Sequence, residues 1–395
     1  MIEYQKKPLP AKVTTIGLAL LVIGAIGIGA SFMVNADRAL FNYLIMYMFI
    51  LSIGLGSLGL VGMEYLVGAT WSTPFRRISE FLSSVLPLMI VLVIPIIIGM
   101  HDLFHWTHHD AVEHDPILQA KEPYLNTPFF IARVGICYAI WMLFYFVFIR
   151  NSRKQDTTGD PRLTKISVRF SAPFAFLFMI TATIAAVDFM MSLEPHWFST
   201  MFGVYYFAGT ILSAFAALTL IGVLLKQNGY LSPKISNSHF YSLGTLMFGF
   251  TVFWAYIGFS QFMLIWYADI PEETFWYMLR FRGDWEYVSY GLLILHFIIP
   301  FIVLLPRTVK TNLSRLKVMG VWILIMQYYD LYWLVMPTYT NSHNIEGPVF
   351  GWMELGFPLA AAGLLILVFA LQAKRNNLLP IGDPKLESGL NFHLY

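Results

Sequence analysis

Long apolar blocks separated by short polar connections make up almost the whole chain. A bilayer core about 30 Å thick is crossed by about 20 residues of α-helix, which rises about 1.5 Å per residue. The pattern predicts an all-α polytopic membrane protein with ten transmembrane helices, a single integral membrane domain. We expect the spans at residues 14–34, 41–67, 80–101, 127–150, 167–193, 199–226, 240–267, 285–306, 314–337 and 350–372.

Composition agrees with this class. Of the 395 residues, 57% are hydrophobic and only 12% are charged. A soluble domain of this size does not need so many hydrophobic residues. Cys137 is the single cysteine. The chain therefore has no disulfide framework, no Cys-x-x-Cys metal site and no Cys-x-x-Cys-His haem attachment.

The positions of the lysines and arginines predict the orientation. Connections that share a side with the two termini carry nineteen of them, and connections on the other side carry four. Cytoplasmic connections of membrane proteins are enriched in basic residues. We therefore expect both termini in the cytoplasm, including a C-terminal tail at residues 373–395.

One junction between spans concentrates polar and aromatic residues. It runs from Asp188, inside the end of one apolar block, to Tyr206 in the next. Pro195 is predicted to end the first helix, because proline cannot continue the hydrogen-bond ladder. Ser199 and Thr200 are candidate caps of the second helix.

A repeat relates this junction to a later one. Asp188 is followed seven positions later by Pro195, and Asp330 is followed seven positions later by Pro337. The two spans run in the same direction, as in the parallel repeats of many membrane proteins. We expect two parallel four-helix bundles, spans two to five (41–193) and six to nine (199–337), flanked by spans one and ten.

Ionisable residues inside the spans are few, and an intramembrane charge indicates function by default. We predict a proton pathway centred on Asp188, with Asp330 and His296 as partners. Its further members are Glu64, Glu80, Glu286, Arg133 and Glu354. Glu64 and Glu80 are expected near the cytoplasmic side, and the other ionisable residues farther from it. Between these two groups we expect the hydroxyls of Thr181, Thr183, Thr210, Ser213, Thr245 and Thr251. The alternative is that Asp188 only hydrogen-bonds near Ser199 or Trp197, and that the small hydroxyl residues only allow close helix packing.

Half of the ten histidines lie in the connection between His101 and His114. His101, His105 and His109 are spaced by four residues, so a continuing helix would place them on one face. That spacing is compatible with Zn²⁺ or Cu²⁺. With no second motif to fix a coordination geometry, we interpret the segment as a solvated or partner-facing loop and assign no metal site.

Two motifs resemble a known family. The run DFMMSLEPHWFSTMFG (188–203) and the run FWAYIGFSQFMLIWY (253–267) resemble the membrane subunits of bacterial alternative complex III, in the polysulfide-reductase (NrfD/PsrC-like) superfamily. With its length and ten spans, the chain is most similar to the smaller of the two such subunits in that complex.

The resemblance implies a non-catalytic or accessory subunit of a quinol:electron-acceptor oxidoreductase in the bacterial inner membrane. The implied partners are a larger NrfD-like sister subunit, an iron–sulfur subunit, multihaem and monohaem cytochrome c subunits, a terminal oxidase and membrane lipid, with no nucleic acid. Haem and iron–sulfur centres belong to those partners, and this chain binds no cofactor of its own except quinol or menaquinol. For quinol we consider Asp188, Glu194, His196 and Trp197, since acids can accept its protons and aromatic rings can stack on its headgroup.

Two other classes remain open. A secondary transporter also uses repeats and polar residues near the membrane midplane, but it usually needs helices broken there. A cytochrome-b-like haem protein needs facing pairs of histidines in its spans. Here only His296 lies deep in a span, with His101 at an edge.

Overall fold

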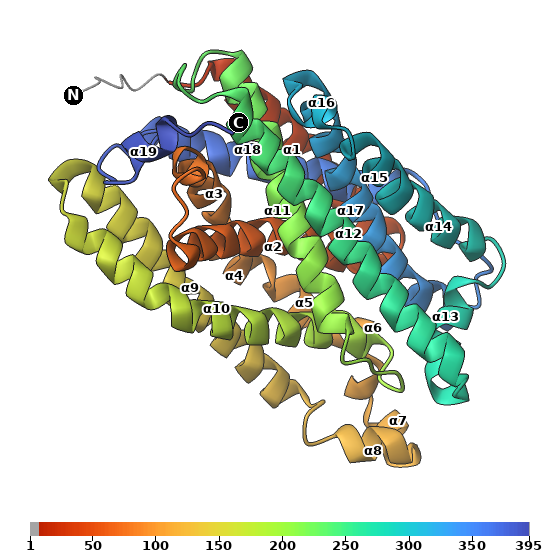
Figure 1. The fold of residues 1–395 in the computed structure, drawn as a ribbon. Coiled ribbons are helices and arrows are strands. Elements are labelled where there is room, and N and C mark those ends of the chain that lie inside the picture. Colours follow the sequence, from red (N-terminus) through yellow and green to blue (C-terminus); the bar gives the residue numbers. More distant parts are fainter. Residues whose placement is uncertain (1–7, 395) are drawn as a thin grey trace.

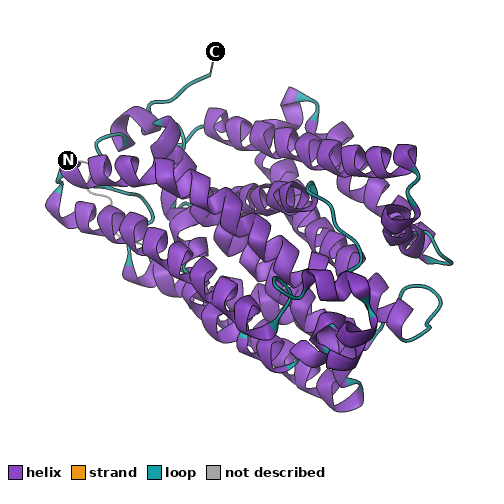
Figure 2. Ribbon diagram, turned by 90° about the horizontal axis from the view of Figure 1, so that it is seen from below, coloured by secondary structure: helices purple, strands orange, loops and turns teal. Residues whose placement is uncertain are grey.

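The computed structural model describes residues 8–394, and every regular element in that range is a helix (Figures 1 and 2). Ten helical segments of the described chain are long and apolar enough to cross a membrane. The predicted all-α fold with ten spans is confirmed, and the chain is a multi-pass membrane protein.

Eight of the ten spans are continuous helices: α1 (Ala11–Val34), α2 (Ala36–Val67), α9 (Thr127–Thr158), α10 (Pro161–Phe189), α11 (Phe202–Gln227), α12 (Asn237–Ala268), α17 (Leu313–Ser342) and α18 (Trp352–Arg375). The eighth span is α14 (Trp285–Leu292), a π-helix (Leu293–Ile298) and α15 (Ile299–Leu304). The third span is α3 (Arg76–Ser83), α4 (Leu86–Leu92) and α5 (Ile94–Ile98).

The broken third span differs from the single helix expected at residues 80–101. Pro87 and Pro95 stand in the first turns of α4 and α5, where proline has no amide proton to continue the preceding helix. The hydroxyls of Ser83 and Ser84 donate to the carbonyl of Glu80 at 2.9 and 3.0 Å. Such side-chain bonds compete with the helical ladder at the first break.

Short elements form the connections: α6 (Met100–Leu103), α7 (His109–His114), α8 (Pro116–Lys121), α13 (Pro271–Arg280), α16 (Arg307–Lys310), α19 (Leu386–Leu390) and 3-10 turns at Thr73–Phe75, His105–Thr107 and Met191–Leu193. We call the side on which α1 begins and α18 ends the basic face. The side that carries α7, α8 and α13 is the histidine-rich face. The two faces lie at the top and bottom of Figure 1.

Local sequence explains where the long helices begin and end. Asn35 and Asn126 accept the backbone N–H of Arg38 and Phe129, both at 2.9 Å, and so cap α2 and α9. Gly68 ends α2 in the left-handed region, with φ of 69°. The span expected at residues 314–337 extends further in the structure, because α17 continues through Pro337 to Ser342.

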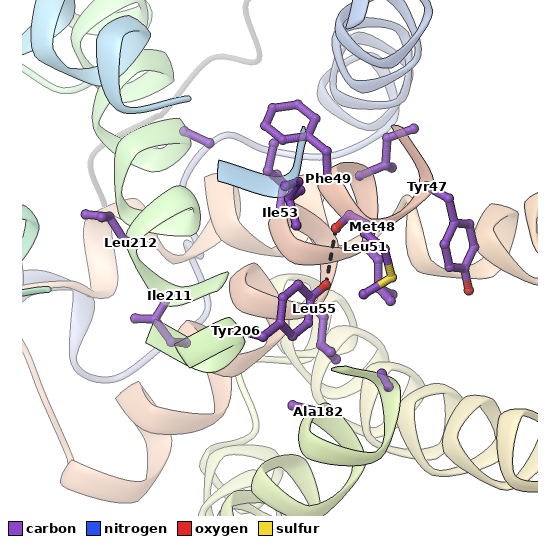
Figure 3. Packing of buried hydrophobic residues seen from close by; sticks show 14 of the residues in the cluster. Tyr47, Met48, Phe49, Leu51, Ile53, Leu55, Ala182, Tyr206, Ile211 and Leu212 are labelled. Carbon is purple, nitrogen blue, oxygen red and sulfur yellow. Dashed lines mark hydrogen bonds between the residues drawn. The ribbon is translucent and has the colours of Figure 1, made fainter. Parts of the chain in front are cut away.

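Helices α2 and α11 form the centre of the molecule, between α9 and α10 on one side and α12, α14 and α15 on the other (Figure 1). Their backbones approach closely at Gly56, where an added Cβ would lie 2.4 Å from the carbonyl oxygen of Thr210. Figure 3 shows this packing, in which the Tyr206 hydroxyl donates to the carbonyl of Met48 at 3.2 Å. The two helices are therefore in direct contact at the centre of the molecule. The arrangement as a repeat of two four-helix bundles stays a prediction.

Helices α1 and α18 form a pair beside this centre. An added Cβ at Gly24 would lie 2.4 Å from the backbone nitrogen of Ala360, and one at Gly363 would lie 2.4 Å from that of Leu21. Small residues at helix interfaces allow such contact in membranes. The pair packs mainly against α2 and α3.

Candidate functional site

Asp330 lies on α17 with its side chain buried. Its Oδ1 accepts the hydroxyl of Tyr205 from α11 at 2.5 Å, and its Oδ2 accepts the indole N–H of Trp254 from α12 at 3.2 Å. Both donors are neutral, and no lysine, arginine or histidine of the described chain forms an ion pair with this carboxyl. The site therefore holds an acid without a countercharge.

His296 contacts the same indole as this acid. Its ring centroid is 4.1 Å from that of Trp254, so one indole contacts the imidazole with its face and bonds Asp330 with its N–H. His296 is fully buried, and neither ring nitrogen has a hydrogen-bond partner within the described residues. It stands on the π-helix, a rare element that is frequent at functional sites. Trp254 thus contacts both of two proton-accepting side chains that were predicted from the sequence as partners.

Asp188 has a different environment. Arg133 from α9 donates Nε to its Oδ2 at 2.8 Å and Nη2 to its Oδ1 at 3.1 Å, and the Tyr124 hydroxyl donates to its Oδ1 at 3.0 Å. Burial and the adjacent Asp188 carboxylate raise the pKa of Tyr124 to about 12. Two predicted residues, Asp188 and Arg133, therefore form one ion pair, separate from the contacts of Asp330.

The expected partners of Asp188 in the following turn bind elsewhere. The Ser199 hydroxyl bonds Gln261 Oε1 at 3.2 Å and accepts the backbone N–H of Met201 at 3.3 Å. The Trp197 indole donates to the carbonyl of Glu273 at 3.1 Å. The alternative in which Asp188 hydrogen-bonds near Ser199 or Trp197 is therefore wrong about the partners. The arginine that binds Asp188 lies on another helix, α9.

The candidate quinol residues of this turn each have a separate environment. Trp197 stacks on Trp276 with centroids 4.4 Å apart. His196 is hydrogen-bonded to Asp115, which lowers the pKa of that carboxyl. Burial raises the pKa of Glu194, against the opposing effects of nearby Thr338 and Arg280. Asp188 and these three residues therefore have separate interaction partners.

The remaining predicted acids of the histidine-rich side lie apart from Asp330. Glu354 accepts Arg38 Nε at 2.7 Å and Nη2 at 2.8 Å, and it also accepts Asn42 at 3.2 Å. Glu286 is half-buried in the first turn of α14. Neither is among the side chains that contact Asp330 or His296 in the part of the chain that the structure describes.

Glu64 and Glu80 belong to a buried ionic cluster at the basic face. Arg76 binds Glu64 at 3.0 Å and Asp383 of the C-terminal tail at 2.5 Å. Arg77 binds Glu80 at 2.5 Å and Asp156 at 2.6 Å. The cluster thus joins α2, α3, α9 and the tail, with four carboxylates around two guanidinium groups.

The hydroxyl residues between the two layers bond mostly within their own helices. The Thr181, Ser213 and Thr251 hydroxyls donate to the carbonyls of Leu177, Gly209 and Met247, four residues earlier, at 2.8, 2.6 and 2.8 Å. This is the usual bond of serine and threonine inside a helix. The protein atoms alone therefore form no continuous hydrogen-bonded path in the described chain between Glu64 and Asp330.

The histidine-rich connection is not a continuing helix. Helix α6 ends at Leu103, and the chain folds back so that the His101 ring lies 3.8 Å from that of His108. The condition for placing His101, His105 and His109 on one helical face is therefore not met. No group of three or more potential metal ligands occurs among residues 8–394.

Several residues that complete these sites were not singled out from the sequence. Tyr205 and Trp254 bind Asp330 from other helices, although Trp254 lies inside the run 253–267 quoted above. In the sequence, Arg76 and Arg77 were used only in the count of basic residues that predicts the orientation. Their signal was the spacing to Glu80, four and three residues later, which allows ion pairs within one helix. Nothing local marks Asp383 or Asp156 as their partners.

Comparisons with known proteins leave the sequence resemblance without independent support. No protein-family model matches this chain, and no curated protein matches its sequence at a significant level.

Proposed function

We propose that this chain is a membrane subunit of a bacterial quinol-oxidising respiratory complex similar to alternative complex III, and that it anchors the redox subunits and passes protons. One observation carries the proton role: in the described structure, buried Asp330 is held only by neutral donors, and one of these, Trp254, also contacts His296, whose ring nitrogens have no hydrogen-bond partner there. An uncompensated buried charge is costly, whereas a paired charge is less so. Asp330 is therefore the proton-holding acid in this proposal, and Asp188 is the structural one.

The resemblance and the site support each other at one residue. Trp254, which contacts both Asp330 and His296, lies in the run that resembles the family. Haem and iron–sulfur centres belong to partner subunits in this proposal, and the membrane is the bacterial inner membrane with both termini cytoplasmic, which the excess of basic residues on that side supports.

The proton path in this proposal is gated. Asp330 lies in the half of α17 nearer the histidine-rich face, His296 lies near the middle of the eighth span, and Glu64 and Glu80 lie in the ionic cluster at the basic face. Side-chain hydroxyls between them bond within their own helices, so ordered water has to bridge the layers. A continuous open pore would dissipate the proton gradient, which favours a half-pathway that opens during turnover.

Copurification is the first test. The tagged chain is extracted from its native membrane in mild detergent, and its partners are identified by mass spectrometry. We expect subunits with haem c and iron–sulfur absorbance to copurify, whereas the chain expressed alone is colourless. A stable chain without redox partners would contradict the respiratory role.

The proton role is tested in liposomes that contain the complete complex. Asp330→Asn keeps the hydrogen-bonding shape but cannot carry a proton, so electron transfer should continue while the proton-to-electron ratio falls. Asp188→Asn is the matched control at the equivalent position of the repeat, and the assembled fraction should retain the ratio. An unchanged ratio in Asp330→Asn would refute the proton role.

A secondary transporter is the second candidate, and the broken third span favours it. Interrupted helices near the midplane form the binding sites of many transporters, and α4 and α5 meet at Val93 within that span. The chain purified alone and placed in liposomes would then drive solute uptake under a proton gradient. Uptake by the isolated chain would select this function over the respiratory one.

A further inference from the structure

A long groove separates the α1/α18 pair from α11 and α17. Its cavity volume is about 830 Å³, and residues of α1 and α18 line one wall while residues of α11 and α17 line the other. Phe49 and Ile53 of α2 form the floor. Because α1 and α18 pack mainly on each other and on α2 and α3, no helix of the described chain fills this space.

The groove is apolar and extends across more than one leaflet. Its lining on α18 runs from Glu354 to Phe369, about 22 Å of helix at about 1.5 Å per residue, whereas half of a bilayer core is about 15 Å. Rim residues such as Ile325 and Leu355 are exposed, so the groove opens toward the hydrocarbon of the membrane.

The lining of the groove suits acyl chains, because nearly all of the residues that line it are apolar or aromatic and its rim opens toward the hydrocarbon of the membrane. Flexible hydrocarbon chains fit such a space, and their apolar contacts with the walls replace contacts with neighbouring lipids.

The two ends of the groove differ in charge. At the basic face, Lys12 lines the groove. Lys317 lies one turn before the lining residue Val321, and its Nζ donates to Gln227 Oε1 at 3.3 Å. No aspartate or glutamate lines this end among the described residues. At the other end, the Glu354 carboxylate is already neutralised by Arg38.

We propose that this groove binds one anionic phospholipid, with its phosphate at Lys12 and Lys317 and its acyl chains along the wall between α18 and α17. Phosphate oxygens accept strong hydrogen bonds from lysine ammonium groups, and basic residues at a membrane surface attract anionic lipid. The lipid would connect the α1/α18 pair to the centre of the molecule where side chains do not. This site is independent of the proton site around Asp330.

Native mass spectrometry of the full chain tests the headgroup. The chain is reconstituted in vesicles of equimolar phosphatidylglycerol and phosphatidylcholine and then transferred to detergent. We expect one retained phospholipid, enriched in phosphatidylglycerol. In Lys12→Gln/Lys317→Gln that enrichment should fall by up to about thirtyfold, since each of the two lysines near a surface contributes roughly 1 kcal/mol. Lys165→Gln, an exposed change on the same face, should keep it.

A second variant tests the position of the acyl chains. Ala362 lines the groove on α18, so Ala362→Trp should fill it and abolish retention of the phospholipid. Ala172→Trp places the same ring on an exposed position of α10, outside the groove, and should retain the lipid. Retention that survives Ala362→Trp, equal retention of both phospholipids, or retention of an isoprenoid quinone in their place would overturn the proposal.

Discussion

Arg133 holds Asp188 through two parallel hydrogen bonds, from Nε at 2.8 Å and from Nη2 at 3.1 Å. Both side chains are buried, with 6% and 0% of their surface exposed. Asp330, at the equivalent position of the sequence repeat, has no such cation among residues 8–394 and accepts there only from Tyr205 and Trp254. The same residue type therefore has two environments, one suited to fixing two helices and the other to exchanging a proton.

Removal of the cation should destabilise the first site. Arg133→Gln leaves the Asp188 carboxylate buried without its counterion, which costs about 3–5 kcal/mol when one partner of a buried pair is lost. We expect a lower thermal midpoint in detergent. The double variant Arg133→Gln/Asp188→Asn removes both charges and should recover most of the loss. Equal loss in the single and double variants would contradict the ion-pair explanation.

The close contact of α1 with α18 gives a matched pair of glycine variants. Gly24→Ala would place a methyl group against the backbone of Ala360 and should destabilise the chain by about 1–3 kcal/mol. Gly29 has nothing within 4 Å of an added Cβ, so Gly29→Ala should be neutral or slightly stabilising. Thermal unfolding in detergent measures both, and the contact is unimportant if the two variants behave alike.

The C-terminal tail should depend on its ion pair with Arg76. Asp383→Asn removes one acid of the basic-face cluster, and we expect the tail to be cleaved faster by a protease added to the solubilised chain. Glu387→Gln changes an exposed acid on α19 and is the control. Equal cleavage of Asp383→Asn and the unaltered chain would show that packing alone holds the tail.

Stability near Glu194 should fall as pH rises. Burial raises the pKa of this carboxyl above 4.5, so the folded state binds the proton more tightly than the unfolded state does. The stabilisation is complete below about pH 4.5 and is lost as pH increases through the raised pKa. Glu194→Gln stays uncharged, so its thermal midpoint should exceed that of the unaltered chain increasingly toward pH 8. A constant difference across pH would contradict this sign.

Orientation can be tested with single cysteines. Glu113 lies in α7 at the histidine-rich face and Thr157 near the end of α9 at the basic face, and both are exposed. In whole cells, a membrane-impermeant thiol reagent should label Glu113→Cys but not Thr157→Cys. The native Cys137 is 3% exposed and serves as the unlabelled background. The reverse pattern would place the termini outside.

The sequence by itself determined the ten spans, because the thickness of a bilayer requires about twenty apolar residues for each crossing. It also singled out Asp188, Asp330 and His296, because an ionisable residue is rare among so many apolar ones. Their distances from the helix ends follow directly from their positions in the apolar blocks.

Only the tertiary structure decided what each ionisable group binds. Asp330 accepts a hydrogen bond from Tyr205, which lies 125 positions away in the sequence. Arg38 donates to Glu354, which lies 316 positions away. Such pairs depend on which helices pack together, and almost every span is apolar around most of its circumference, so periodicity in the sequence does not identify the contacting faces. Helix packing therefore decided that, within the described part of the chain, Asp188 is paired with a cation and Asp330 is not.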